Sequence, residues 1–351
     1  MANFVLLKDP ACYVADDWDM AGRAASRGHW LDLFEAHFAE TLKLAASNLP
    51  ETSAPNVARA SEEFSTWMAR LRRDPTALDS GRLTGMDLDR LRERVMRENE
   101  LGDPYRRIKD RENALAVSLY GDLTAQLDAM SDGERWPAMV RGIFAGNRFD
   151  LGAQSIRHGS QRAPDFFESF SGLKPRPWRV DDLDALAADL QRPGRWAKAV
   201  VFVDNAGGDF VLGIVPFVRA LAACGTQIVL AANEGPALND ITIAEAHDVL
   251  ARLGRIDEVL AAQLTEGRIR AVSSGGRFPM IDLANVSDEL NDAARDADLV
   301  ILEGMGRAIE SNYDAQFTVD SLHLALLKDE EIAGRIGGEL YDCVCKYRPL
   351  A

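Results

Sequence analysis

The chain has 351 residues, and its 55 acidic and 40 basic side chains give a formal net charge of −15 at pH 7. Hydrophobic residues make up 47% of it and charged residues 27%, proportions typical of a folded globular protein with one large or two ordinary domains. A chain this acidic has no electrostatic attraction to DNA, RNA or an anionic membrane surface, so we expect no nucleic-acid or membrane partner.

The first part of the chain, residues 1–190, has a mainly helical pattern, and we interpret it as a helical cap region. Apolar residues recur at helical spacing over 61–71, 87–98 and 108–130. Prolines lie in the gaps between these segments, where they end helices or start turns. The pattern predicts separate helices joined by turns.

In the second part, residues 191–351, strands alternate with helices. Continuous apolar runs predict strands at 199–203, 227–232, 269–272, 299–302, 322–327 and 342–345. Helical patterns lie between or after them at 210–223, 241–253, 286–295 and 330–336. Strands that are apolar on both faces are typical of parallel sheets covered on both sides. We therefore predict an α/β fold with a mostly parallel, Rossmann-like sheet flanked by helices and preceded by the helical domain.

Two features of the sequence bear on the cellular compartment. The start of the chain lacks the basic segment and small-residue cleavage site of a signal peptide, and no apolar run approaches the length of a membrane span. The four cysteines are too few and too scattered for a disulfide framework. We interpret Cys343 and Cys345 as buried hydrophobic side chains rather than metal ligands. A cytoplasmic protein is expected.

Polar residues and glycines follow three of the predicted strands. They are Asp204-Asn205, Asn239-Asp240 and the run Glu303-Gly304-Met305-Gly306-Arg307. Since ligands of a parallel sheet bind beyond the carboxyl ends of its strands, we expect these residues to share one edge. Carboxylate and carboxamide oxygens suit Mg²⁺ or Mn²⁺, and glycines let backbone amides approach an anion. The same residues could instead cap helices and form tight turns, and their convergence at one edge favours the functional interpretation.

Several familiar enzyme classes lack their sequence signature here. Neither the dinucleotide fingerprint nor the P-loop occurs, which disfavours a dinucleotide oxidoreductase or a P-loop kinase. A phosphatase with Asp204 as nucleophile would need a second aspartate two residues on, where Ala206 stands, so a metal-ligand role for Asp204 is favoured. The five histidines do not cluster, which argues against a histidine-rich zinc site.

The segments around these residues resemble the second subfamily of the damage-control phosphatases, once catalogued as domain of unknown function 89. The resemblance lies in VFVDNAGGDFVLGIVPFVRAL at 201–221, NEGPALNDIT at 233–242 and LVILEGMGRAIESNYDA at 299–315, with EGMGR as the subfamily signature. It covers about residues 100–351 well. The sequence is similar both to stand-alone plant members and to the C-terminal domain of the vertebrate pantothenate-kinase-like protein.

This resemblance implies a metal-dependent phosphomonoester hydrolase with Asp204, Asn205 and Asp240 as ligands of Mn²⁺, Co²⁺ or Ni²⁺, with Mg²⁺ also possible. The implied substrate is a small phosphate ester, 4′-phosphopantetheine or its oxidised, damaged forms, in coenzyme A metabolism. A sugar phosphate or another phosphometabolite is the alternative substrate. A transferase that binds S-adenosylmethionine or a nucleotide is the alternative class. Family members usually have serine at position 206 and a small residue at position 234, whereas this chain has Ala206 and Glu234. These two differences are expected to affect which substrate is preferred.

Roles for further residues follow from phosphoryl-transfer chemistry and from the resemblance. Arg307 and Lys346 are candidates for clamping phosphate oxygens, although Lys346 could equally be an ordinary surface lysine. Glu303 could take a proton, orient the water or hold the glycine loop. Predicted substrate contacts are Asn239, which could instead only shape the turn, Gly304, Met305, Gly306, Asn147 and Asp150. The last two lie in the helical part, where they could line the substrate pocket or make an ordinary interdomain contact. Lys109, Glu112 and Asn113 are further candidates there.

Overall fold

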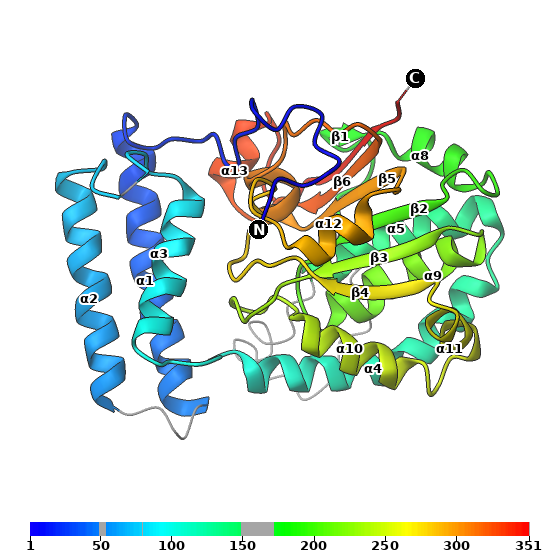
Figure 1. The fold of residues 1–351 in the computed structure, drawn as a ribbon, viewed down its shortest axis with the longest axis horizontal. Helices are drawn as coiled ribbons and strands as arrows, with labels where there is room; N and C mark the ends of the chain where they lie inside the picture. Colours follow the sequence, from blue (N-terminus) through cyan, green and yellow to red (C-terminus); the bar gives the residue numbers. More distant parts are fainter. Residues whose placement is uncertain (49–53, 79, 149–171, 351) are drawn as a thin grey trace.

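The computed structural model of the protein describes residues 1–48, 54–78, 80–148 and 172–350. Within them, a seven-stranded sheet with the order β1-β7-β6-β5-β2-β3-β4 forms the centre (Figure 1). The strands are β1 Val180–Asp181, β2 Lys198–Phe202, β3 Gln227–Ala232, β4 Ile269–Ser273, β5 Leu299–Glu303, β6 Asp320–Leu326 and β7 Cys343–Arg348. Neighbouring strands pair in parallel except β6 and β7, which are antiparallel. The predicted mostly parallel α/β sheet is confirmed.

Helices cover both faces of this sheet (Figure 1). The helices are α4 Arg106–Asp128, α5 Asp132–Arg148, α8 Leu183–Leu190, α9 Val215–Ala223, α10 Ile243–Leu253, α11 Glu258–Thr265, α12 Asp288–Ala294 and α13 Glu330–Arg335. Two short π-helical turns, η1 Asp209–Ile214 and η2 Gly306–Glu310, follow the ends of β2 and β5. Both turns matter for the candidate site because they begin at the carboxyl ends of central strands.

Successive side chains of the central strands enter two different hydrophobic cores, as the two-residue period of a strand requires. In β2, Val201 lies in one core and Val200 and Phe202 lie in the other. The first core includes side chains of α4, α5 and α8–α11, and the second includes those of the N-terminal segment, α12 and α13. Because neither face is left to solvent, these strands are continuous apolar runs, which is why they were predictable.

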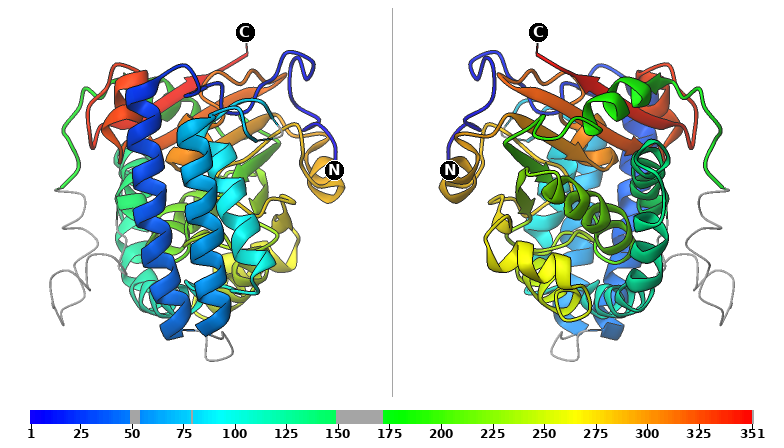
Figure 2. Two further views of the ribbon diagram at one scale, coloured as in Figure 1. Left: turned by 90° about the vertical axis from the view of Figure 1, so that its left-hand side faces the viewer. Right: turned by 90° about the vertical axis from the view of Figure 1, so that its right-hand side faces the viewer.

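The remaining helices form a bundle beside the sheet (Figure 2). They are α1 Ala24–Asn48, α2 Ala54–Arg73 and α3 Gly85–Glu98. Thr84 begins α3 with a capping box in which its side chain accepts from the backbone N–H of Asp87. The helical segments predicted at 61–71, 87–98 and 108–130 fall in α2, α3 and α4, whereas the 25-residue α1 was not predicted as a separate helix.

Three further predictions concern the cysteines, the domain boundary and membrane helices. Cys343 and Cys345 are fully buried in β7, as predicted. The predicted boundary at residue 191 stays a prediction; β1, which precedes it, pairs with β7 at the edge of the sheet. Among the described helices, none combines the length and the apolar character that crossing a membrane requires.

Candidate active site

The loop after β2 brings the first candidate residues to the edge of the sheet. Asp204 and Asn205 follow the strand directly, and the chain then turns through Gly207 into η1. Gly207 has a φ of +72°, and a Cβ there would lie 2.8 Å from the Cβ of Glu112 in α4. Asn113, also in α4, accepts a 2.7 Å hydrogen bond from the Gly207 backbone. The helical part of the chain therefore holds this loop in place.

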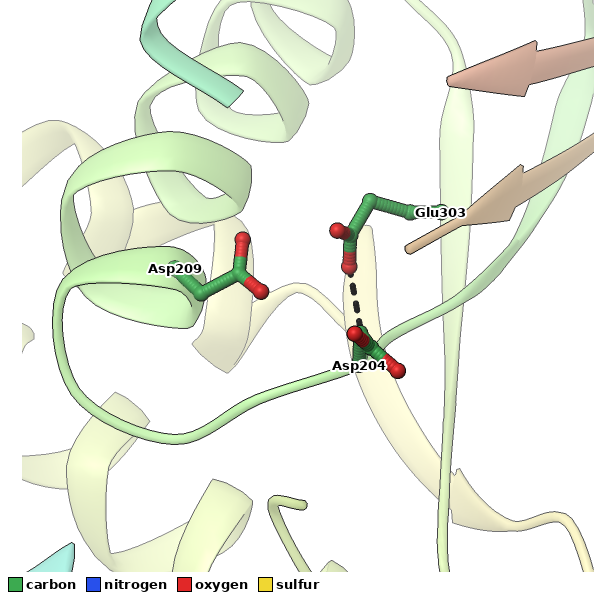
Figure 3. Close-up of side chains that lie close together, drawn as sticks. All are labelled: Asp204, Asp209 and Glu303. Carbon is green, nitrogen blue, oxygen red and sulfur yellow. Dashed lines mark hydrogen bonds between the residues drawn. The ribbon is translucent and has the colours of Figure 1, made fainter. Parts of the chain in front are cut away.

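Three buried carboxylates meet at this edge: Asp204, Asp209 at the start of η1, and Glu303 at the end of β5 (Figure 3). One ligand oxygen of each lies within 4.8 Å of the others. Glu303 Oε2 accepts from the backbone N–H of Asp204 at 2.9 Å. Asp204 and Glu303, which follow or end two different strands, therefore lie close together as expected, and their role in a site stays a prediction. Asp209 was not predicted as a site residue.

Two asparagines bind these carboxylates from the sides. Asn147, near the end of α5, points its Nδ2 at Asp209 at 2.8 Å and at Asp204 and Glu303 at 3.2 Å. Asn205 Nδ2 donates to Asp204 Oδ2 and Asp209 Oδ2, both at 2.8 Å. The helical part thus contributes Asn147 directly to this cluster.

The electrostatics of the cluster are unfavourable for three negative charges. Burial and the charge of Asp204 raise the pKa of Asp209 to about 6. Burial, with Asp209 and Asp204 nearby, raises the pKa of Glu303 well above its usual range. Within the described part of the chain, the Oδ1 atoms of Asp209 and Asn147 are buried without a hydrogen-bond partner. Buried carboxylates that repel one another fit the oxygen donors that a divalent cation prefers.

Arg307, in η2, links this cluster to Asp240. Its Nη1 pairs with Asp204 Oδ1 and donates to the carbonyl of Pro279 at 3.2 Å. Its Nη2 donates to Asp240 Oδ2 at 2.8 Å and to Asn233 Oδ1 at 3.2 Å. The side chain is almost fully buried. The guanidinium therefore lies behind the carboxylates, with both terminal nitrogens already committed to protein acceptors.

Backbone hydrogen bonds hold Asp240 beside Asp204 and Asn205. Asn205 and Asp240 form an isolated antiparallel bridge, and the backbone N–H of Ile241 donates to the Asp204 carbonyl at 3.0 Å. Burial raises the pKa of Asp240 to about 7, although Arg307 favours its charged form. The buried Lys109 ammonium donates to the Asp240 carbonyl at 3.4 Å and pairs with Glu245. The structure thus brings Asp204, Asn205 and Asp240 together.

The glycines of the EGMGR run are needed for close packing. Gly304 has a φ of +90°, and a Cβ there would overlap the side chain of Asp204. A Cβ at Gly306 would lie 2.8 Å from the Pro279 carbonyl oxygen. Between them, the Met305 sulfur accepts from the backbone N–H of Lys328 at 3.2 Å. This run therefore shapes the wall behind Asp204.

Lys328 lies at this edge and was not predicted from the sequence. It follows β6, and its Nζ donates to the Asn147 carbonyl at 3.3 Å. Its positive charge favours the charged form of Asp209, so it acts on the acidic cluster, and its side chain is exposed. Its position directly after a buried strand, in LLKDE, was the available sequence signal.

The other predicted residues lie in different surroundings. Lys346 is in the middle of β7, opposite His323, where its Nζ contacts the carbonyl and ring of Tyr313. Its described contacts do not include the acidic cluster. Asn239 accepts a backbone hydrogen bond from Ala206 at 2.9 Å. Asp150 lies outside the described residues.

Glu234, noted above as a departure from the subfamily pattern, does not carry an isolated charge. Its carboxylate pairs with Arg277 at 3.2 Å, and both side chains are about half exposed. Arg277 lies in the loop after β4, and its stem is 3.2 Å from where a Cβ of Gly235 would be. The negative charge of Glu234 is therefore largely compensated near the edge of the sheet.

Residues 35–344 match the family description "damage-control phosphatase ARMT1-like domain". A damage-control phosphatase of Arabidopsis thaliana is 43% identical over 324 residues, covering 92% of this chain and 88% of that protein. The 4′-phosphopantetheine phosphatase of Mus musculus is 34% identical, over 99% of this chain and 48% of that protein, so the chain spans about half of that relative. A crystal structure of a DUF89 family protein from Pyrococcus horikoshii has the same fold, with a TM-score of 0.67 at 18% identity, covering 91% of this chain and 97% of that one.

Proposed function

The chain belongs to the ARMT1-like damage-control phosphatase family, and from that membership we propose that it hydrolyses 4′-phosphopantetheine or an oxidised form of it with a bound divalent metal ion. The resemblance predicted from the sequence is confirmed, and the chain is a phosphomonoester hydrolase. The transferase alternative is set aside by this membership. The substrate proposal rests on the name of the mouse relative, and a sugar phosphate is the competing candidate.

We infer that Asp204, Asn205 and Asp240 hold the metal ion, with Asp209 and Glu303 beside it. The ligand set is the one that the family resemblance implies. The observation that supports a cation at this edge of the sheet is the buried cluster of Asp204, Asp209 and Glu303, which shares Asp204 with that set. When bound, a divalent ion supplies positive charge to a phosphoryl oxygen and to the attacking water. Oxygen donors bind Mn²⁺, Co²⁺, Ni²⁺ and Mg²⁺, so the activity of the protein with each ion identifies the one it uses best.

The two cationic side chains near the cluster, Arg307 and Lys328, have different roles in this proposal. Arg307 holds Asp204 and Asp240 in place from behind, so the phosphate needs a different cation to bind it. Lys328 is exposed, and its ammonium lies beside the acidic cluster. We assign phosphate binding to Lys328 in place of the role predicted for Arg307 and Lys346.

Neutral and acidic side chains position the cluster. Both oxygens of Glu303 accept hydrogen bonds, one from the Asp204 backbone and one from Asn147, which favours a positioning role over proton transfer. The Asn147 amide keeps three carboxylates at hydrogen-bond distance and so limits where a bound phosphate ester can lie. Lys109 supports the Asp240 backbone from the buried side.

The test measures released phosphate from 4′-phosphopantetheine, its sulfonate, a panel of sugar phosphates and an aryl phosphate. Activity should vanish with EDTA and return with Mn²⁺, Co²⁺ or Ni²⁺. Asp204→Asn should lose both activity and saturable Mn²⁺ binding by calorimetry. Asp248→Asn, an exposed aspartate on α10, should keep both. Metal-independent activity, or normal Mn²⁺ binding by Asp204→Asn, would contradict the proposed metal site; a clear preference for a sugar phosphate would contradict only the substrate.

A further inference from the structure

Helix α4 contacts both of the segments that carry the proposed metal ligands. Its Asn113 side chain accepts a 2.7 Å hydrogen bond from the backbone of Gly207, shortly after Asn205. Its Lys109 ammonium donates to the carbonyl of Asp240 at 3.4 Å. Lys109 and Asn113 are four residues apart, so they lie on one face of the helix, about 6 Å apart along its axis. One helical turn therefore spans the two ligand segments.

The ammonium group of Lys109 is fully buried between two carboxylates. Its Nζ pairs with Asp103 and with Glu245, both at 2.9 Å. The Asp240 carbonyl is the third acceptor, and an ammonium group has three N–H donors. Because these donors are committed to protein oxygens, Lys109 is not a phosphate-binding cation, and its contacts serve to fix the segments around it.

Glu245 extends this contact to the start of α10, which lies beside α4 (Figure 1). Its Oε2 accepts from the backbone N–H and from the hydroxyl of Thr242, both at 2.9 Å, in the capping box that begins the helix. Thr242 follows Asp240 by two residues. Lys109 thus holds this ligand segment at two points, the Asp240 carbonyl and the first turn of α10.

The other end of α4 is fixed by separate contacts. The Tyr120 hydroxyl donates to Asp257 Oδ2 at 2.9 Å, and Asp257 is the N-cap of α11. Near the end of α4, Asp128 pairs with Arg219 of α9 at 3.0 Å. A helix held at both ends keeps its position relative to the sheet, so α4 is a rigid reference for both ligand segments.

The two ligand segments also bond to each other. The backbone N–H of Ile241 donates to the Asp204 carbonyl at 3.0 Å, and that of Ala206 donates to the Asn239 carbonyl at 2.9 Å. Together with the contacts to α4, these bonds form a closed frame around the ligands. Since a metal ion binds tightly where its ligands are already held at the required spacing, the frame bears directly on the affinity for the ion.

We propose that α4 sets the spacing of the two metal-ligand segments, with Lys109 and Asn113 as positioning residues that act together. This inference rests on the proposed function, because it takes Asp204, Asn205 and Asp240 as the ligands. It gives the helical part of the chain, interpreted from the sequence as a cap, a direct effect on the affinity for the metal ion.

The experiment measures Mn²⁺ binding to the full chain by calorimetry, together with urea unfolding of the metal-free protein. Lys109→Met and Asn113→Ala should each lower the affinity for Mn²⁺ by about tenfold or more, the lower end of the range for outer-shell partners of metal ligands. If Lys109→Met does not fold, Asn113→Ala decides the outcome, because it removes a single hydrogen bond.

Each variant has a matched control in the helical bundle. Arg92→Met removes a buried cation of α3 that pairs with two carboxylates, at 2.7 and 3.0 Å. Asn99→Ala removes a buried amide that donates to Glu63 of α2 and to a carbonyl of α3, both at 2.9 Å. Both controls should lose stability and keep their affinity for Mn²⁺ within about twofold of the parent, since they share no partner with the ligand segments.

Backbone hydrogen exchange of the metal-free chain gives a second reading that does not depend on the ion. In Asn113→Ala, exchange at the Gly207 amide should be about 2- to 10-fold faster, the value of one hydrogen bond. In Lys109→Met, the amides of Ile241 and Thr242 should exchange faster, because the segment loses its support from α4. Neither control should change exchange at these positions.

The double variant Lys109→Met/Asn113→Ala tests whether the two residues act together. Release of either segment already removes the fixed spacing, so the loss of Mn²⁺ affinity should be smaller than the product of the two single losses. Unchanged affinity in a folded single variant, an equal loss in its control, or a double loss equal to the product would overturn the inference while the proposed metal site stands. A parent chain without saturable Mn²⁺ binding would contradict the proposed metal site and this inference with it.

Discussion

Replacement of Arg307 by glutamine tests the arrangement of the acidic site most directly. The guanidinium bonds to Asp204, Asp240, Asn233 and the Pro279 carbonyl, and it is almost fully buried. Removal of one partner of a buried ion pair costs about 3–5 kcal/mol, because the other charge stays buried without compensation. Here two carboxylates lose their cation at once. Since a whole domain is stable by only about 5–15 kcal/mol, we expect the metal-free variant to lose about a third or more of its stability.

The assay is urea unfolding in EDTA, followed by far-UV circular dichroism. Mn²⁺ should restore part of the loss, because a ligand at about 100 times its dissociation constant stabilises the folded state by about 2.7 kcal/mol. Arg348→Gln is the control: its ion pair with Asp182 is largely exposed, and such pairs contribute about 0–1 kcal/mol. If Arg307→Gln unfolds within about 1 kcal/mol of the parent in EDTA, Arg307 does not hold the two buried carboxylates as described.

Three further outcomes follow from the geometry. Gly304→Ala should abolish phosphatase activity because its Cβ overlaps Asp204, whereas Gly225→Ala, at a similar φ of +104° with no neighbour within 4 Å, should cost only backbone strain and stay active. Lys328→Gln should lower kcat/KM by about 10- to 100-fold, the value of a hydrogen bond to a charged group, while Lys346→Gln should change it less than about twofold; the reverse order would return phosphate binding to Lys346. Because the pKa of Glu310 rises to about 8 on folding, the parent loses stability as the pH increases from its unfolded value, near 4.5, to about 8. The melting temperature of Glu310→Gln should therefore exceed that of the parent by an amount that grows over this range, and a constant difference would contradict the buried, charge-repelled carboxyl.

The sequence alone determined the sheet and the edge of it that carries the candidate site. The central strands are buried on both faces, so their apolar runs stand out, and β3 was predicted at the bounds that the structure has. Because the carboxyl ends of parallel strands meet at one edge, the sequence also predicted that Asp204, Asp240 and Glu303 lie there. Helix α1 was missed as a separate element, since its burial depends on packing against α2 and α3, which no local pattern records.

Only the tertiary structure decided which side chains meet. Asn147 and Glu303 are 156 residues apart, and their hydrogen bond depends on how α5 crosses the end of the sheet. Lys328 and Lys346 look alike as lysines near predicted strands, yet one lies beside the acidic cluster and the other binds the Tyr313 carbonyl. The difference is one of register: Lys328 follows the end of β6, whereas Lys346 lies within β7 opposite His323. Strand order and register place side chains in three dimensions, and they depend on contacts between segments that are distant in the chain.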